Sequence, residues 1–152
     1  MSQFHTMSAA ETQALGRSFA RSLMPGDVVA VSGNLGAGKT RFITGVCEGL
    51  GAQGHVSSPT FTLIHEYPAR SAPIIHIDLY RISSRREAVE LGLHEYFDTG
   101  HICLIEWAEK ILDMLPPHYR LVKIEFGDAR EERHVTIEEV TPASIVPGGY
   151  ET

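Results

Sequence analysis

Three stretches of the chain are almost continuously apolar, which is typical of strands buried on both faces of a sheet. They cover residues 27–32, 74–80 and 101–107, with cores such as Val-Val-Ala-Val and Ile-Cys-Leu-Ile. Short runs that are rich in β-branched residues favour strands over helices. The three runs therefore predict the centre of a sheet.

A helical period precedes the first of these runs. Leu15, Phe19 and Leu23 recur every four positions and would share one face of a helix. Ser8 followed three residues later by Glu11 is the pattern of a capped helix start. We expect a helix from Ser8 to about Leu23.

The other expected elements are shorter. They are strands over residues 61–67, 119–126 and 134–140, a short helix from Ser83 or Ser84 through Leu91, and a helix after Trp107 to about Leu115. The strands at 61–67 and 74–80 would pair as a hairpin. Strands interleaved with helices imply an α/β sheet covered on both faces. We expect one domain over residues 1–152, with a loose tail after about residue 141.

Residues 33–40, Gly-Asn-Leu-Gly-Ala-Gly-Lys-Thr, carry the most specific chemical signal. They have the form G-x-x-x-x-G-K-T of a phosphate-binding P-loop, between the strand at 27–32 and a helix expected over 41–50. In such a loop backbone N–H groups converge on phosphate oxygens, and the positive end of the next helix faces the same anion. Lys39 is expected to reach the β- and γ-phosphates, and the Thr40 hydroxyl to bind Mg²⁺.

A P-loop enzyme also needs an acid for Mg²⁺ and a group that orients the attacking water. Asp78 and Glu106 each end an apolar strand, at the edge where ligands bind in open α/β sheets. A carboxylate there is costly unless it is paired or binds a metal, so both are catalytic candidates. Which of the two contacts the metal stays open. Thr60, in the loop before the expected hairpin, is a third candidate, because small GTPases place a nucleotide-sensing threonine there.

The composition of the chain argues against some classes of function. The net charge is −6 without a long basic block, which argues against a broad nucleic-acid-binding face. No Asn-Lys-x-Asp segment for guanine is present, which favours ATP. No apolar run approaches the length of a membrane span, and Cys47 and Cys103 lie in apolar segments where reduced thiols are typical. We expect a cytoplasmic protein.

Three weaker features have less specific interpretations. Arg81, Arg85 and Arg86 form either a small basic patch for a phosphate or a partner, or solvated charges at the start of a helix. Trp107, the only tryptophan, stacks at the site or at an interface, or packs in the core. The eight histidines show no metal-ligand spacing, and we expect ordinary surface or buried residues.

Four motifs in this order resemble the TsaE family, also called YjeE. They are the loop at 33–40, Ser-Pro-Thr-Phe-Thr at 58–62, His-Ile-Asp-Leu-Tyr-Arg at 76–81 and Ile-Glu-Trp-Ala-Glu-Lys at 105–110. The resemblance extends from about Ser8 to Arg133. The family comprises bacterial ATPases required to make threonylcarbamoyladenosine at position 37 of tRNA.

The resemblance implies a P-loop NTPase-type three-layer sandwich with a mixed, partly parallel central sheet. It implies that Mg²⁺ lies on Thr40 and Glu106, and that Thr60, Asp78 and Trp107 matter for activity beside the catalytic Lys39 of the loop. The residues expected to bind ATP or ADP are Ser8, Gly33, Gly36, Ala37, Gly38, Lys39, Thr40 and Arg41. The implied partners are TsaB and TsaD, of which TsaD transfers the threonylcarbamoyl group. The TsaE protein would reset that complex by ATP hydrolysis, so that it meets tRNA only indirectly.

Two positions depart from the family pattern. Asn34 stands where aspartate is common and presents mainly its backbone to the loop. Arg41 stands where a second hydroxyl residue is common, so it would approach the α-phosphate by its backbone N–H or its charge. Two other functions stay open: a small-molecule kinase, which needs an acceptor pocket and a basic lid, and a nucleotide switch that does not hydrolyse ATP. We favour an ATPase that is slow when alone.

Overall fold

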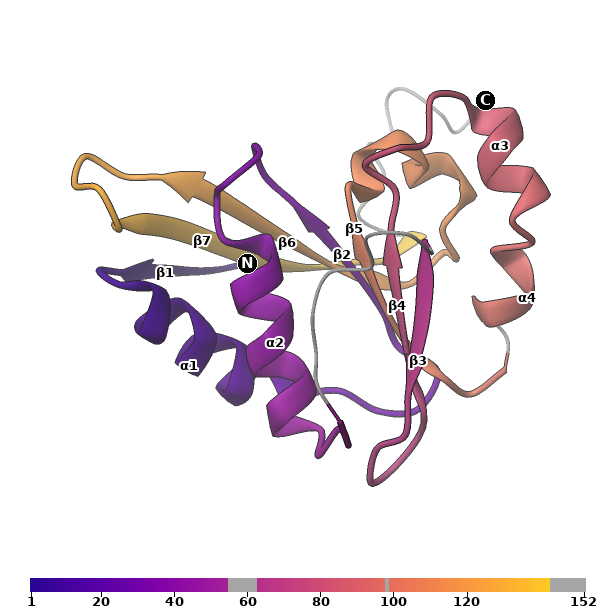
Figure 1. Cartoon of the computed structure of the whole chain (residues 1–152), viewed down its shortest axis with the longest axis horizontal. Helices are drawn as coiled ribbons and strands as arrows, with labels where there is room; N and C mark the ends of the chain where they lie inside the picture. The colour runs from indigo at the N-terminus through magenta and orange to yellow at the C-terminus, as the bar shows by residue number, and fades with distance from the viewer. Residues whose placement is uncertain (55–62, 98, 143–152) are drawn as a thin grey trace.

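The computed structural model describes residues 1–54, 63–97 and 99–142, and a single sheet runs through this part of the chain (Figure 1). Its seven strands lie in the order β1-β7-β6-β2-β5-β4-β3. In chain order they are β1 (Ser2–Thr6), β2 (Val28–Ser32), β3 (Ile64–Tyr67), β4 (Ile74–Asp78), β5 (Ile102–Glu106), β6 (Tyr119–Phe126) and β7 (Arg133–Val140).

The strand pairing confirms a mixed, partly parallel sheet. Strand β2 pairs in parallel with β5 and β6, and β4 pairs in parallel with β5. The outer pairs β1–β7, β6–β7 and β3–β4 are antiparallel, and the last of them is the predicted hairpin. Because parallel strands end at the same edge of a sheet, β2, β4 and β5 bring their last residues close together.

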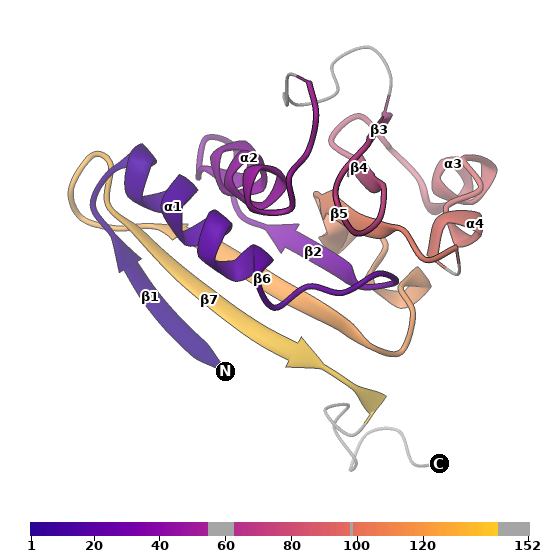
Figure 2. The ribbon, with the colours of Figure 1, turned by 90° about the horizontal axis from the view of Figure 1, so that it is seen from below.

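Two helices cover one face of the sheet, α1 (Ala9–Ala20) and α2 (Lys39–Gly49). They lie side by side in both views (Figures 1 and 2). Their backbones approach closely at Gly45, where a Cβ atom would lie 1.9 Å from the carbonyl oxygen of Gln13. Phe19 and Phe42 meet beneath the crossing, with ring centroids 5.7 Å apart. Both helices are predicted from the sequence, although α1 ends three residues before Leu23.

The opposite face of β2, β4 and β5 is covered by short elements. These are α3 (Arg85–Glu90), α4 (His94–Phe97) and the 3-10 helices η1 (Ala108–Lys110) and η2 (Leu112–Met114). Figure 2 shows α3 and α4 on the other side of the sheet from α1 and α2. Ile77, Leu93 and Ile105 are fully buried in this layer. The expected α/β fold with cover on both faces is therefore confirmed.

One helix predicted from the sequence does not form. The segment after Trp107 forms η1 and η2 and not an α-helix that reaches Leu115. Its buried side chains, Ala108, Ile111 and Met114, recur every three positions. Ile111, between η1 and η2, has a φ of −137°, which is not helical, so the segment forms two short turns and not one continuous helix.

The sequence also fails to predict β1. Phe4 is its only large apolar residue, so it shows no alternation, and it forms because it pairs with β7 along its whole length. The part of the expected tail after residue 142 lies outside the described residues. No helix in the described part of the chain is long and apolar enough to cross a membrane.

Candidate functional site

The glycine-rich loop (residues 33–40) connects the end of β2 to the start of α2. Gly33 must be small, because a Cβ atom there would lie 2.5 Å from the carbonyl oxygen of Ile124 on β6. Gly38 is the N-cap of α2 and has a φ of 105°, in the left-handed region that glycine tolerates. The first N–H groups of a helix have no partner within it and, with the helix dipole, attract anions. This loop therefore places an anion-attracting helix end beside the last residues of β2.

Lys39 is held inside this loop. Its Nζ donates to the carbonyl oxygens of Gly33 and Asn34, the latter at 3.0 Å. It also lies over the ring of Trp107, 4.0 Å from the centroid. Burial lowers the pKa of Lys39, and the negative charges of Glu106, Glu109 and Asp78 oppose that shift. A partly desolvated ammonium group of this kind gains from a further anionic partner.

The two predicted acids meet at one edge of the sheet. The parallel register sets Asp78 of β4 directly beside Glu106 of β5, and Glu106 beside Val31 of β2. Glu106 is almost completely buried, with 3% of its surface exposed. Its Oε1 accepts a hydrogen bond from the Thr40 hydroxyl at 3.2 Å. The structure thus brings together Thr40 and Glu106, the two residues predicted to share a metal ion.

His76 orients Glu106 from the middle of β4. It is completely buried, and its Nε2–H donates to Oε2 of Glu106 at 2.7 Å. The Nδ1 atom of the same ring has no hydrogen-bond partner among the described residues. With one oxygen held by His76, the other oxygen of Glu106 faces Thr40. The motif at 76–81 contains this histidine, but the sequence gives no reason to place it under Glu106.

The carboxylate of Asp78 is held by a backbone hydrogen bond and lies near the charged groups of Glu106 and Lys39. Its Oδ1 accepts from the N–H of Tyr80 at 2.9 Å. Burial raises the pKa of Asp78, the charge of Glu106 adds to this, and the Tyr80 N–H works against it. Two carboxylates this close repel each other unless a cation lies between or beside them.

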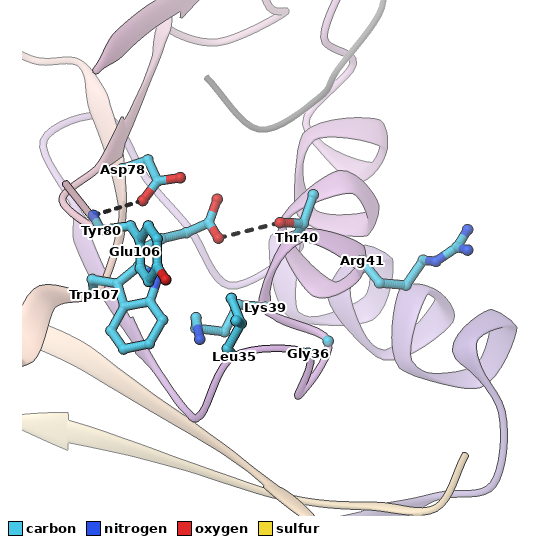
Figure 3. Close-up of a pocket in the computed structure, with 10 residues that line it drawn as sticks. Leu35, Gly36, Lys39, Thr40, Arg41, Asp78, Tyr80, Glu106 and Trp107 are labelled. Atoms are coloured by element: carbon cyan, nitrogen blue, oxygen red, sulfur yellow. Dashed lines mark hydrogen bonds between the residues drawn. The ribbon is translucent and has the colours of Figure 1, made fainter. Parts of the chain in front are cut away.

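These groups line a cavity of about 310 Å³. Its walls are Leu35, Gly36, Gly38, Lys39, Thr40, Arg41, Asp78, Tyr80, Glu106 and Trp107. Figure 3 shows Glu106 between Asp78 and Thr40, with Lys39 on the side of the cavity next to Trp107. Trp107 takes a left-handed backbone with φ 60° and packs on Tyr80 with ring centroids 5.1 Å apart. Both aromatic rings therefore belong to the site and not to the core alone.

Some predicted residues do not line the cavity, and Arg41 lines it with its side chain turned away. Ser8 caps α1, where its hydroxyl accepts from the N–H of Glu11 at 3.1 Å, and it is not among the residues that line the cavity. Ala37, a residue of the loop itself, has a buried side chain. The guanidinium of Arg41 points towards α1 and donates to Gln13 at 3.1 Å (Figure 3), which leaves its backbone N–H as the group nearest the loop. Thr60 lies outside the described residues.

Two of the three arginines, Arg85 and Arg86, make surface ion pairs. Arg85 pairs with Asp113, and Arg86 lies 3.7 Å from Glu90 on the same face of α3. The charged groups of these pairs are well exposed to solvent. This arrangement favours the interpretation of solvated charges for these two residues.

Comparison with known sequences and structures identifies the family. The sequence model described as "Threonylcarbamoyl adenosine biosynthesis protein TsaE" matches residues 6–135. The chain belongs to the TsaE family. A TsaE protein of Bacillus subtilis is 42% identical over 139 residues, which are 91% of this chain and 85% of the relative. One from Streptomyces coelicolor is 38% identical over 128 residues, 81% of this chain and 86% of the relative.

A solved structure supports the same assignment. A crystal structure of YdiB from Bacillus subtilis superposes with a TM-score of 0.78 at 36% identity, covering 94% of this chain and 88% of that one. The chain is thus a TsaE-family α/β protein, and its family acts in the biosynthesis of threonylcarbamoyladenosine in tRNA.

Sequence reasoning missed a residue that supports the loop of this TsaE-family chain. Arg133, the first residue of β7, donates from Nε to the carbonyl of Ala37 at 2.8 Å and from Nη2 to that of Gly36 at 3.3 Å. Its guanidinium also lies 4.9 Å from the ring centre of Phe126. Because Arg133 lies about ninety positions beyond the loop and in no motif, no local signal in the sequence indicates this contact.

Proposed function

We propose that this TsaE-family chain is a Mg²⁺-dependent ATPase that supports the threonylcarbamoyladenosine modification of tRNA by acting on a complex of TsaB and TsaD. The observation that carries the proposal is the hydrogen bond between Thr40 and Glu106, which joins the end of the glycine-rich loop to the acidic edge of the sheet. A P-loop enzyme needs its phosphate cradle and its metal-binding acid to meet in this way.

The donor set fits Mg²⁺. Two neighbouring ligands of an octahedral Mg²⁺ ion lie about 2.9 Å apart, given metal–oxygen distances near 2.0–2.1 Å. Thr40 Oγ1 and Glu106 Oε1 are 3.2 Å apart and are both hard oxygen donors. When bound there, Mg²⁺ would neutralise charge on the β- and γ-phosphates. His76 holds the other oxygen of Glu106, so this ligand is oriented before any ion arrives.

The remaining groups have separate roles in the proposed phosphoryl transfer. Backbone N–H groups at the start of α2 and the Lys39 ammonium would stabilise charge on the transferred group. Lys39 would turn from the carbonyls of Gly33 and Asn34 towards phosphate oxygens. Asp78, whose pKa is raised by burial, has an oxygen available to orient or accept a proton from the attacking water.

The surroundings of the cavity suit a protein that works within a complex. Leu35 and Tyr80 flank the cavity and are 68% and 49% exposed, so they offer apolar surface to a nucleotide base or a partner. The net charge of −6 agrees with an indirect role for tRNA. We place this activity in the cytoplasm, where tRNA is modified, and expect slow hydrolysis by the isolated chain.

Hydrolysis of ATP by a Glu106→Gln variant tests the proposal. We expect this variant to bind ATP and to lose at least about a hundredfold in turnover, because an amide is a poor Mg²⁺ ligand. Glu95→Gln removes the same charge from an exposed position on α4, away from the cavity, and should change turnover little. The assay is phosphate release by the chain alone and with purified TsaB and TsaD.

The outcomes separate the alternatives. ATP consumption that depends on an added metabolite and yields its phosphate ester would indicate a kinase. ATP-dependent association with TsaB and TsaD that survives Glu106→Gln, with no phosphate release by the unmodified chain, would indicate a switch without hydrolysis. Equal turnover by Glu106→Gln and Glu95→Gln would contradict the proposed role of Glu106.

A further inference from the structure

A second cluster of ligand-type side chains lies away from the cavity, on the uncovered face of β1 and β7. In the described part of the chain no helix covers this face (Figure 2). His5 of β1 stands directly opposite His134 of β7 in the antiparallel register. Their rings stack with centroids 5.0 Å apart and planes 23° apart, and both side chains are about half exposed. Two imidazoles are therefore held side by side on a rigid ladder.

Glu132 brings a carboxylate to the same two rings. Its Oε2 contacts Nε2 of His5 and lies 3.9 Å from Nε2 of His134. Its Oε1 accepts from the N–H of Ala129 at 2.8 Å, within the turn between β6 and β7. One oxygen is thus anchored to the backbone, and the other is aimed at both histidines.

We propose that His5, Glu132 and His134 form a binding site for a divalent transition-metal ion of the Zn²⁺ type. One ligand atom from each residue lies within 4.8 Å of the others. Two imidazoles and a carboxylate are ligands that Zn²⁺ accepts, with a fourth position for water. Mg²⁺ and Ca²⁺ prefer oxygen ligands and bind imidazole poorly. This site and the Mg²⁺ site proposed at Thr40 would therefore select different ions.

The three side chains would have to move only slightly to bind a tetrahedral ion. Ligand atoms about 2.0–2.1 Å from a tetrahedral ion lie about 3.3–3.4 Å from each other. The 3.9 Å separation of His134 and Glu132 would contract slightly, and His5 and Glu132 would move apart as the ion enters between them. Rotation of two half-exposed rings is enough for both changes.

Metal binding would join the edge strand β1 to the β6–β7 turn. Strand β1 pairs only with β7 among the described strands, and it leads into α1, whose first N–H at Ala9 donates to Glu131 at 3.2 Å. The same turn leads into Arg133, which binds the glycine-rich loop from the other side of β7. An ion bound to the native state alone would raise the melting temperature with its concentration.

Titration of the tag-free full-length chain with Zn²⁺ tests this site. We expect one equivalent to bind and the melting temperature to rise. The His5→Ala/His134→Ala double variant should lose more than about tenfold in affinity and the Zn²⁺-dependent rise in melting temperature. His118→Ala removes an exposed histidine elsewhere and should bind like the unmodified chain. Substitution by Co²⁺ should give the visible absorption of a four-coordinate ion, absent in the double variant.

Several results would overturn the site. Equal Zn²⁺ affinity in the double variant and the unmodified chain would place the ion elsewhere, for example at His76 and Glu106. Failure of the unmodified chain to bind one equivalent would remove the proposal altogether. Far-ultraviolet circular dichroism and Mg·ATP binding of the double variant report whether it is folded, since neither histidine belongs to the nucleotide cavity.

Discussion

The centre of the sheet and its β1–β7–β6 side differ in where their polar residues lie. The parallel centre, β2, β4 and β5, is covered on both faces, and its polar side chains are His76 and the strand ends Ser32, Asp78 and Glu106. The antiparallel wing, β1, β6 and β7, is covered on one face by α1 and presents residues such as His5, Glu125 and His134 on the other.

The comparison shows under which conditions a buried polar site and an exposed polar cluster form. In the centre a polar side chain is desolvated, so it must be paired, and its pKa is shifted as that of Asp78 is. In the wing a polar side chain keeps contact with water, and a cluster forms only where cross-strand register and a turn bring side chains together. The proposed ATP site belongs to the first kind, and the proposed Zn²⁺ site to the second.

The largest expected effect compares one apolar residue from each half. Ile105→Ala in β5 should lower the free energy of unfolding by about 3–4 kcal/mol, because it empties a site buried between two layers. Ile137→Ala in β7, where the side chain is only partly buried, should cost about 1 kcal/mol. Urea unfolding followed by circular dichroism measures both. Equal losses would show that the wing is packed as fully as the centre.

Removing the lysine of the centre should weaken nucleotide binding. Lys39→Met should lower the affinity for Mg·ATP about thirtyfold, or about 2 kcal/mol, since it removes a charged hydrogen-bond donor. Lys123→Met, on the exposed face of β6, removes the same charge from the wing and should leave affinity nearly unchanged. Isothermal titration calorimetry reports both values. An unchanged affinity in Lys39→Met would refute the P-loop assignment.

A smaller effect tests whether the wing supports the centre. Arg133→Met should lower Mg·ATP affinity about fivefold, or about 1 kcal/mol, because the carbonyls of Gly36 and Ala37 lose their donors. The methionine keeps apolar contact with Phe126, and Arg130→Met in the exposed turn is the matched control. If the two variants bind nucleotide equally well, the loop holds its shape without help from β7.

The smallest effect is a pH dependence of stability in the centre. Since the folded state raises the pKa of Asp78 above its unfolded value near 3.9, its ionisation destabilises the fold as the pH rises above that value. Asp78→Asn should therefore melt at a higher temperature than the unmodified chain near neutral pH, with the gap closing below about pH 4. Differential scanning fluorimetry across this range measures the gap. A gap that widens on acidification would contradict the burial effect.

The elements of the centre were predictable, and so was the convergence of their strand ends. The runs at 27–32, 74–80 and 101–107 are apolar because both faces are buried, and a buried strand that ends in a carboxylate marks the functional edge. The roles of Asp78, Glu106 and Lys39 in catalysis stay predictions. The 3-10 turns after Trp107 were not predicted, since helix propensity does not reveal a three-residue burial period until the core is known.

The amino-acid sequence alone determined the glycine-rich loop, the buried strands and the family, because these depend on local backbone requirements and on apolar periodicity. Tertiary structure decided that His76 lies under Glu106, that Arg133 holds the loop, and that His5 meets Glu132 and His134. These contacts join residues separated by 30, 96 and 127 positions, and such pairs leave no periodic signal, because strand order and register alone bring them together.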